Sequence, residues 1–189
     1  ERRAGTVGFP LPGVELKITD PETGKTLPDG EIGQIEVRGP NVFKGYWQMP
    51  EKTAAELRDD GFFITGDLGR IDTDGYVHIV GRNKDLIISG GYNIYPKEIE
   101  LVLDDQPGVL ESAVIGVPHP DFGETVLGVI VPEKGAAPDT EAMMQAVQQA
   151  LARFKHPRAL VMLDDLPRNT MGKVQKNLLR DSYKDMFAG

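Results

Sequence analysis

Three short segments of the sequence carry residue types that could do chemistry. The first is Thr65-Gly66-Asp67, which follows an apolar, β-prone stretch at 62–65. A carboxylate at a strand end, next to a glycine, can accept hydrogen bonds from both hydroxyls of a ribose. Aspartate beside glycine is also a common turn residue. The tripeptide alone therefore leaves a nucleoside site and a structural turn both open.

The second segment, residues 81–96, joins a charged cluster to a pair of glycines. Arg82 could be a surface cation, or it could donate hydrogen bonds to a sugar or phosphate. Gly90 and Gly91 permit positive φ angles and the close approach of backbone to a ligand. The pair also fits a plain tight turn before a helix that we expect to begin at Pro96.

The third segment is a polar loop at 166–174, which places Lys173 shortly before another expected helix. Neither a helix dipole nor burial favours a lysine at that position. Its simplest chemical role is to bring a mobile positive charge to the anion of a partner, and the alternative is an ordinary surface lysine.

Several other kinds of chemistry are excluded or unsupported. The chain has no cysteine, which excludes disulfides, thiolate metal sites and a cysteine nucleophile. His78, His119 and His156 are scattered, with no partner at i+4, so we expect none of them to bind a metal and predict no metal site. The sequence has no Ser-His-Asp arrangement that we can defend, and no glycine-rich phosphate loop ending in Lys-Ser or Lys-Thr.

The elements that must position these residues change in kind partway along the chain. Up to residue 80 the pattern predicts strands and one short helix, and glycine at 33 marks a possible bulge. The expected elements are strands near 14–18, 32–37, 62–71 and 76–80, a helix at 53–57, and a hairpin turn at 72–75. This predicts a small β-rich subdomain, built as a distorted barrel or sheet.

After residue 81 strands and helices mix, which predicts an α+β unit of about 105 residues. We expect strands at 84–89, 109–117, 125–131 and 159–163, and helices from Pro96 to 103, at 143–154 and at 178–187. The domains predicted are therefore 1–81 and 82–189. Because the chain opens on a residue other than Met, in mid-sequence, we expect a fragment of a longer protein.

The charge balance and the length limit the class of protein. The 189 residues carry a formal net charge of -8, which argues against a nucleic-acid binder. No apolar run is long enough to span a membrane and no secretory signal is present, so we expect a cytoplasmic protein. Residues 151–189 nevertheless hold 8 Lys or Arg and 4 Asp or Glu. That basic segment is either a solvated surface or a site that meets a phosphate or carboxylate.

Together the segments resemble the adenylate-forming superfamily of acyl-CoA synthetases, luciferases and peptide-synthetase adenylation domains. The resemblance covers essentially the whole chain, because five motifs occur in the order and spacing of the family. They are Gly30-Glu31-Ile32 through Val37-Arg38-Gly39-Pro40 with Lys44-Gly45-Tyr46-Trp47; Thr65-Gly66-Asp67; Gly81-Arg82-x-Lys84-Asp85; Gly90-Gly91-x-Asn93-Ile94-x-Pro96-x-Glu98-Ile99-Glu100; and Pro167-Arg168-x3-Gly172-Lys173-Val174. Segments 41–47, 60–67 and 166–176 look most like those of malonyl-CoA synthetases.

The resemblance implies roles in making an acyl-adenylate from ATP and a small carboxylic acid. Asp67 is expected to bind the ribose hydroxyls, and Arg82 to share that ribose. Lys173 is expected to be the catalytic lysine, since an ammonium that touches both the attacking carboxylate and the α-phosphate stabilises the transition state. Mg²⁺ and the acyl group are expected to be bound mainly by a part of such enzymes that lies upstream of this sequence.

For the second half-reaction, the resemblance implies that coenzyme A attacks the adenylate. Gly90 and Gly91 are expected to line the path of the pantetheine thiol. Lys84 is expected to be the hinge about which a mobile C-terminal domain exchanges the Lys173 loop for the Gly90–Gly91 face.

We therefore expect the C-terminal portion of an ATP-dependent acyl-CoA synthetase, an acid–thiol ligase that activates malonate, with the 189 residues inactive alone. One alternative is an adenylation domain that loads a carrier protein. Another is that the isolated chain is a non-catalytic module, recognised by a lysine acetyltransferase or deacetylase at Lys173.

Overall fold

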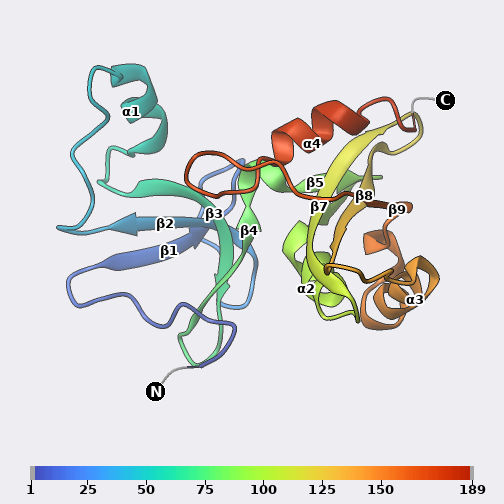
Figure 1. Ribbon diagram of the computed structural model, residues 1–189. Helices are drawn as coiled ribbons and strands as arrows, with labels where there is room; N and C mark the ends of the chain where they lie inside the picture. The colour runs from blue at the N-terminus through green and yellow to red at the C-terminus, as the bar shows by residue number, and fades with distance from the viewer. Residues whose placement is uncertain (1–2, 188–189) are drawn as a thin grey trace. The chain divides into compact units, whose positions relative to one another are not determined.

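The computed structural model describes residues 3–187, which divide into two compact units (Figure 1). The first unit ends at Lys84 and the second begins at Asp85. The boundary lies three residues after residue 81, because strand β4 (Val77–Arg82) continues to Arg82 and pairs there with β3 (Phe63–Ile71). The fold class is α+β, as the sequence predicted.

The first unit is a four-stranded antiparallel sheet in the order β1-β2-β3-β4, with β1 at Glu15–Thr19 and β2 at Gly33–Arg38. Of the two shapes expected, the sheet is open, since β1 and β4 form its edges. It is distorted by shifts of register between Gln34 and Glu36 of β2 and between Leu68 and Gly69 of β3. Helix α1 (Pro50–Glu56) begins on a proline, which has no backbone N–H to satisfy there.

A small core holds this sheet together. Ile18, Ile35 and Val77 are its buried centre. Glu36 is also completely buried, and its carboxylate accepts hydrogen bonds from Thr19 and Arg58. A buried charge is tolerated in a sheet only when partners of this kind surround it.

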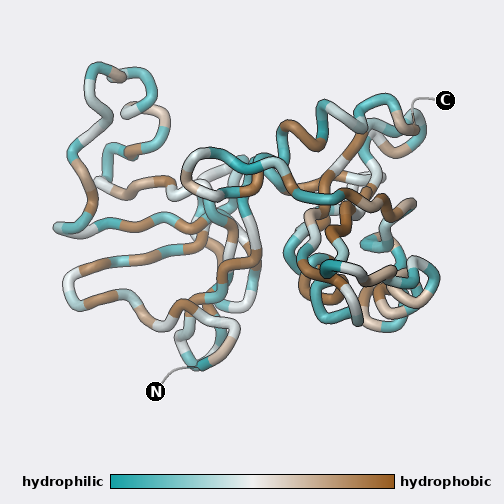
Figure 2. The backbone as a smooth tube through the Cα atoms, in the orientation of Figure 1, coloured by the Kyte–Doolittle hydropathy of each residue, from teal (hydrophilic) through white to brown (hydrophobic). Residues whose placement is uncertain are grey.

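The second unit is built on a long antiparallel hairpin, β7 (Val109–His119) and β8 (Gly123–Pro132). The strand order is β6-β5-β8-β7, with β5 at Ile87–Ser89 and β6 at Tyr92–Ile94. Strand β9 (Ala159–Met162) pairs with β8 in parallel. The central strands carry the strongly hydrophobic stretches of this unit (Figure 2), as strands covered on both faces must.

Helices cover both faces of that sheet. Helices α2 (Pro96–Asp104) and α3 (Thr140–Ala150) pack on one face, where Ile99, Leu103 and Met143 join one hydrophobic core. Helix α4 (Lys176–Tyr183) packs on the other through Leu179, which belongs to a second core. Figure 1 shows this layering, with α4 on the opposite side of the sheet from α2 and α3.

Several expected elements have different bounds, including the three that follow. In place of the strand start at 84, the polar residues Asn83–Asp85 form a 3-10 turn, and only Ile87–Ser89 extend. The helix expected to reach Phe154 ends at Ala150, and Phe154 lies in a second 3-10 turn, Arg153–Lys155. The terminal helix is shorter than expected at its C-terminal end. No helix between residues 3 and 187 has the length and apolarity to cross a membrane.

Candidate functional site

Asp67 lies in β3, and the side chain of Thr65, two residues earlier, fixes its backbone. The Thr65 hydroxyl donates a hydrogen bond to the Ile35 carbonyl at 2.8 Å and accepts one from the Asp67 N–H at 3.1 Å. Gly66 between them has φ of +75°, a conformation that other residues rarely adopt. The tripeptide is therefore part of strand β3, and its local hydrogen bonds fix the position of Asp67.

Arg82 of β4 stands directly opposite Asp67 in the sheet register. Its Nε lies 2.8 Å from Asp67 Oδ1, and its guanidinium also donates to the Thr65 carbonyl at 3.3 Å. Burial raises the pKa of Asp67, and the positive charge of Arg82 opposes that rise. The Arg82 side chain is half exposed, so this pair presents an acceptor and a donor to a polyhydroxyl ligand.

Gly90 and Gly91 form the two-residue turn between β5 and β6, where Ser89 pairs with Tyr92. Both glycines have positive φ, 55° and 84°, as the twist of a tight hairpin requires. The Gly90 N–H donates to the Phe122 carbonyl at 2.9 Å, which ties the turn to the start of β8. A Cβ at Gly90 would stand 3.3 Å from the Phe122 ring, whereas one at Gly91 would meet open space.

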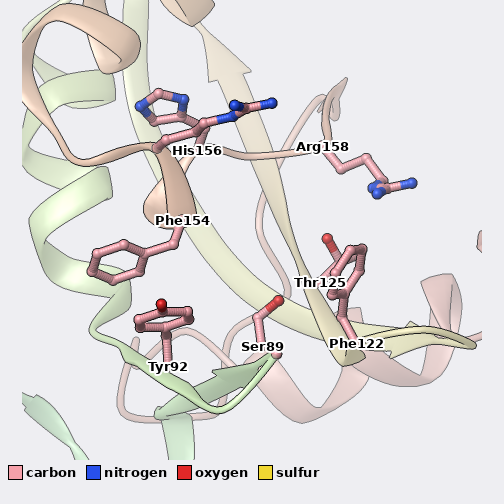
Figure 3. Close-up of a pocket in the computed structure, with 9 residues that line it drawn as sticks. Ser89, Tyr92, Phe122, Thr125, Phe154, His156 and Arg158 are labelled. Carbon is pink, nitrogen blue, oxygen red and sulfur yellow. The ribbon is translucent and has the colours of Figure 1, made fainter.

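A pocket of about 530 Å³ opens beside this turn in the second unit. Tyr92 and Phe154 stack on one side with ring centroids 4.7 Å apart, and Phe122 and Arg158 stand on the other (Figure 3). The complete lining is Ser89, Gly90, Tyr92, Phe122, Thr125, Arg153, Phe154, His156 and Arg158. Aromatic faces suit a planar base and guanidinium groups suit phosphate, so the pocket has the chemistry to hold a nucleotide.

Sequence reasoning missed this pocket. Its aromatic and basic side chains come from three separate stretches of the chain, and no spacing rule connects them. Phe154 was assigned to the apolar face of a helix, but the residue is exposed and stacks on Tyr92 instead. The available signal was the unusual coincidence of Phe154, His156 and Arg158 within five residues of a loop.

Lys173 is the last residue in the loop of a small hairpin, which is closed by a bridge between Arg168 and Val174. The side chain of Asn169 organises the tip, because its Oδ1 accepts the N–H groups of Met171 and Lys173, each at 3.0 Å. Arg168 donates to the Gly172 carbonyl at 2.8 Å and forms an ion pair with Glu111 of β7. Lys173 is thus exposed on a locally fixed backbone, as a lysine that reaches toward a partner's anion must be.

Lys84 lies in the 3-10 turn Asn83–Asp85 and is the last residue of the first unit. The structure thus pairs Asp67 with Arg82 and places Gly90 and Gly91 in one turn. Its two units carry different candidate residues, with Lys173 in the second. Among residues 3–187 no group of three or more histidine, aspartate or glutamate side chains could hold a metal ion.

Two family models match the chain. The model for the AMP-binding enzyme C-terminal domain matches residues 98–173, and the model for AMP-binding enzymes matches residues 1–47. The first of these begins on helix α2 and includes Lys173 and the pocket residues from Phe122 to Arg158, but not Ser89, Gly90 and Tyr92.

Curated relatives extend the similarity over nearly the whole chain. A feruloyl-CoA synthase of Amycolatopsis sp is 44% identical over 181 residues, which is 96% of this chain and 36% of that protein. A malonate–CoA ligase of Arabidopsis thaliana is 41% identical over 195 residues, 97% of this chain and 31% of that protein. The chain thus spans about a third of the length of the curated relatives it matches.

A solved structure agrees with them. The crystal structure of ATP-bound MatB from Rhodopseudomonas palustris matches with a TM-score of 0.93 and 64% sequence identity, covering 99% of this chain and 37% of that one. Because both family models match and the similarity extends over nearly the whole chain, the chain belongs to the AMP-binding, adenylate-forming enzymes, of which it carries the C-terminal part.

Proposed function

We propose that the chain works as the C-terminal part of an ATP-dependent acyl-CoA ligase. Such a ligase joins a carboxylate to AMP with loss of pyrophosphate, and then transfers the acyl group to the sulfur of coenzyme A with loss of AMP. The observation that carries the proposal is that the candidate residues lie on locally fixed backbone outside the hydrophobic cores, with Asp67 and Arg82 paired across β3 and β4 and Lys173 exposed in its loop. A merely structural use of these motifs would not require an exposed Lys173.

In the first half-reaction, the Asp67–Arg82 pair is suited to bind the ribose hydroxyls of the nucleotide. Lys173 would contribute an ammonium to the carboxylate and α-phosphate, two anions that repel each other as they approach. The backbone of the hairpin loop is fixed at Lys173, which favours this role because a preorganised charge needs no reorganisation at the moment of reaction. No part of this assignment uses a metal bound by the described residues.

In the second half-reaction, the pocket beside Gly90 and Gly91 is suited to the nucleotide end of coenzyme A. Stacked aromatic rings would take the adenine, and Arg158 and Arg153 would take phosphate. The exposed backbone at Gly91 leaves room for the pantetheine chain to pass. Lys84 would be the pivot between the two steps, because the first unit ends there.

We further propose malonate as the acid. The Arabidopsis relative is a malonate–CoA ligase, and the chain is 64% identical to MatB. The feruloyl-CoA synthase shows how similar this part of the chain can be in a ligase for a much larger acid. Assay of the full-length protein with malonate, methylmalonate and ferulate tests the choice, and a preference for ferulate would overturn it.

The Lys173→Ala substitution tests the main proposal in the full-length ligase. Adenylate formation is expected to fall on the order of a hundredfold to a thousandfold, as when one transition-state contact is lost. Thioester formation from pre-made acyl-adenylate is expected to stay close to that of the unaltered enzyme. An equal loss in both half-reactions would remove the role assigned to Lys173.

The two alternatives have tests of their own. An adenylation domain that loads a carrier protein would acylate a pantetheinylated carrier in preference to free coenzyme A. Recognition by a lysine acetyltransferase or deacetylase needs an accessible lysine, and Lys173 meets that requirement. Incubation with such an enzyme, followed by mass mapping of Lys173 against the other lysines, tests this partner. Action in the cytoplasm stays a prediction.

A further inference from the structure

Two of the carboxylates of helix α2, Glu98 and Glu100, have contacts that lie in different parts of the second unit. Residues two apart on an α-helix point about 200° away from each other. The Glu98 carboxylate lies 2.5 Å from Lys155 Nζ, and that of Glu100 lies 2.5 Å from Lys176 Nζ. Each partner stands next to a different one of the two candidate sites.

Glu98 holds the aromatic wall of the pocket. Its partner Lys155 ends the 3-10 turn Arg153–Lys155, and the residue before it is Phe154. Phe154 stacks on Tyr92, the first residue of β6. Because both charged side chains are less than a third exposed, the ion pair fixes this short turn more firmly than a solvated pair could.

Glu100 connects the two helix layers around the edge of the sheet. Its carboxylate is buried and accepts the Val114 N–H of β7 at 3.0 Å. The same oxygen accepts from Lys176, the first residue of α4 on the opposite face. Since β7 is the last strand of the sheet, Glu100 takes up an edge N–H that lacks a neighbouring strand.

The Lys173 hairpin is therefore anchored at both ends. Arg168 at its beginning pairs with Glu111 of β7, and Lys176 shortly after its end pairs with Glu100. Lys173 lies between these two anchors, with only two residues between it and Lys176. Loss of either anchor frees the backbone from which the Lys173 side chain extends.

We propose that Glu98 and Glu100 are positioning residues that divide the two half-reactions between them: Glu98 sets the pocket for the thiol step, and Glu100 sets the Lys173 hairpin for the adenylate step. This rests on the proposed function. Neither residue acts on the substrate directly. Both are arranged on one helix, so a single element holds the two working surfaces of the unit in register.

Isosteric substitutions separate the two effects. In Glu100→Gln the amide oxygen still accepts the Val114 N–H, but the ionic bond to Lys176 is lost. In Glu98→Gln the ionic bond to Lys155 is lost in the same way. Glu141→Gln, at an exposed position in the first turn of α3, is the matched control for removing one negative charge.

In the full-length ligase each substitution is expected to affect one half-reaction. Glu100→Gln should lower kcat for adenylate formation about tenfold or more, with the KM for ATP little changed, since a small misplacement of a catalytic group is costly. Glu98→Gln should raise the KM for coenzyme A several-fold, roughly three- to tenfold, while adenylate formation is retained. Equal losses in both steps for both variants would show a merely structural role and overturn the proposal.

Amide hydrogen exchange on the 189-residue chain gives a readout that does not depend on activity. Glu100→Gln should speed exchange at the Asn169, Met171 and Lys173 amides, and Glu98→Gln should speed it around Lys155 only. Unchanged exchange in both variants overturns the anchoring itself. Local changes as expected, in a full-length protein without acyl-CoA ligase activity, would instead overturn the proposed function and the division of steps while the two anchors stand.

Discussion

Replacing Arg58 with methionine should destabilise the first unit strongly, because it removes the main partner of a buried charge. The Glu36 side chain has no exposed surface, and Arg58 approaches its Oε1 through Nε at 2.8 Å and through a terminal nitrogen at 2.6 Å. The Thr19 hydroxyl donates to the same oxygen at 2.8 Å. Lys17 Nζ is 3.4 Å from Oε2, which accepts no hydrogen bond among the described residues.

The expected size follows from what remains after the substitution. Removing one partner of a buried ion pair typically costs about 3–5 kcal/mol, because an uncompensated charge stays behind. Lys17 and Thr19 remain next to Glu36, and Arg58 is itself a third exposed, so we expect the low end, about 3 kcal/mol. That is roughly a hundredfold change in the unfolding equilibrium.

The pH dependence of stability gives a second, independent test of this reasoning. Burial favours the neutral form of Glu36, but the hydrogen bonds from Arg58 and Thr19 outweigh it and hold the pKa below its ordinary value. In the unaltered chain this stabilisation is present above the ordinary pKa and is lost as the pH falls through the lowered one. Without Arg58, burial dominates and the pKa of Glu36 should rise, so protonation should stabilise the variant. The difference in the free energy of unfolding between the unaltered chain and the Arg58→Met variant, the stability gap, should therefore narrow as the pH is lowered.

Native-state hydrogen exchange at the β2 amides, Gly33–Arg38, measures this for the first unit alone. Lys25→Met, which removes an exposed cation of the same unit, is the control. The double variant Glu36→Gln/Arg58→Met should recover much of the loss, since the buried group is then neutral. A gap below 1 kcal/mol, a gap that does not change with pH, or a double variant no more stable than Arg58→Met would refute the reasoning.

Three more expectations concern the sites. Gly90→Ala should raise the KM for coenzyme A more than Gly91→Ala, as measured by initial rates at varied coenzyme A. Both substitutions meet positive-φ strain of about 1–2 kcal/mol, but only the new Cβ at position 90 presses on Phe122. Lys84→Pro should spare adenylate formation and block the thiol step, which separate half-reaction assays of the full-length ligase would measure. Asp67→Asn should weaken AMP binding, as measured by calorimetry. In the unaltered ligase, binding should weaken on acidification from a pH above the usual aspartate range, since burial raises the pKa of Asp67.

Much of the fold could be predicted from local patterns, because alternating and helical periodicities survive folding. The β7–β8 hairpin and the helix that begins at Pro96 lie where their apolar spacing put them. The failures occur where polar residues end an element through tertiary contacts. Asp85, expected within a strand, instead pairs with Arg180 of α4 at 2.6 Å, a contact 95 residues away in the sequence. No local signal contains that partner.

The candidate sites divide along the same line. Asp67, Arg82, Gly90, Gly91 and Lys173 could be selected by type and order, because each motif lies within a few residues. The pocket could not, since its walls come from a hairpin turn, the start of β8 and the loop after α3. The anchoring of the Lys173 hairpin was hidden for the same reason. Its ion pairs join residues 57 and 76 positions apart.

The basic segment 151–189 is the clearest case in which charge counting overstates a site. The sequence left open whether its eight cations meet an anion or simply face solvent. Half of them do meet an anion, but one within the chain: among the described residues, four form ion pairs with carboxylates of the same unit. These pairs are Lys155–Glu98, Arg168–Glu111, Lys176–Glu100 and Arg180–Asp85.

The cations that the proposed chemistry needs are a smaller set with a different placement. Arg153 and Arg158 line the pocket, and Lys173 is exposed in the hairpin loop. Lys155 pairs from the same 3-10 turn as Arg153, and Arg168 and Lys176 anchor the hairpin that carries Lys173. The net positive charge of the segment is thus mainly a consequence of where its acidic partners lie in the sequence, on residues 85–111 and outside the counted window. In the proposed mechanism, anion recognition in this unit depends on the positions of three side chains, and the paired cations Lys155, Arg168 and Lys176 help to position two of them, Arg153 and Lys173.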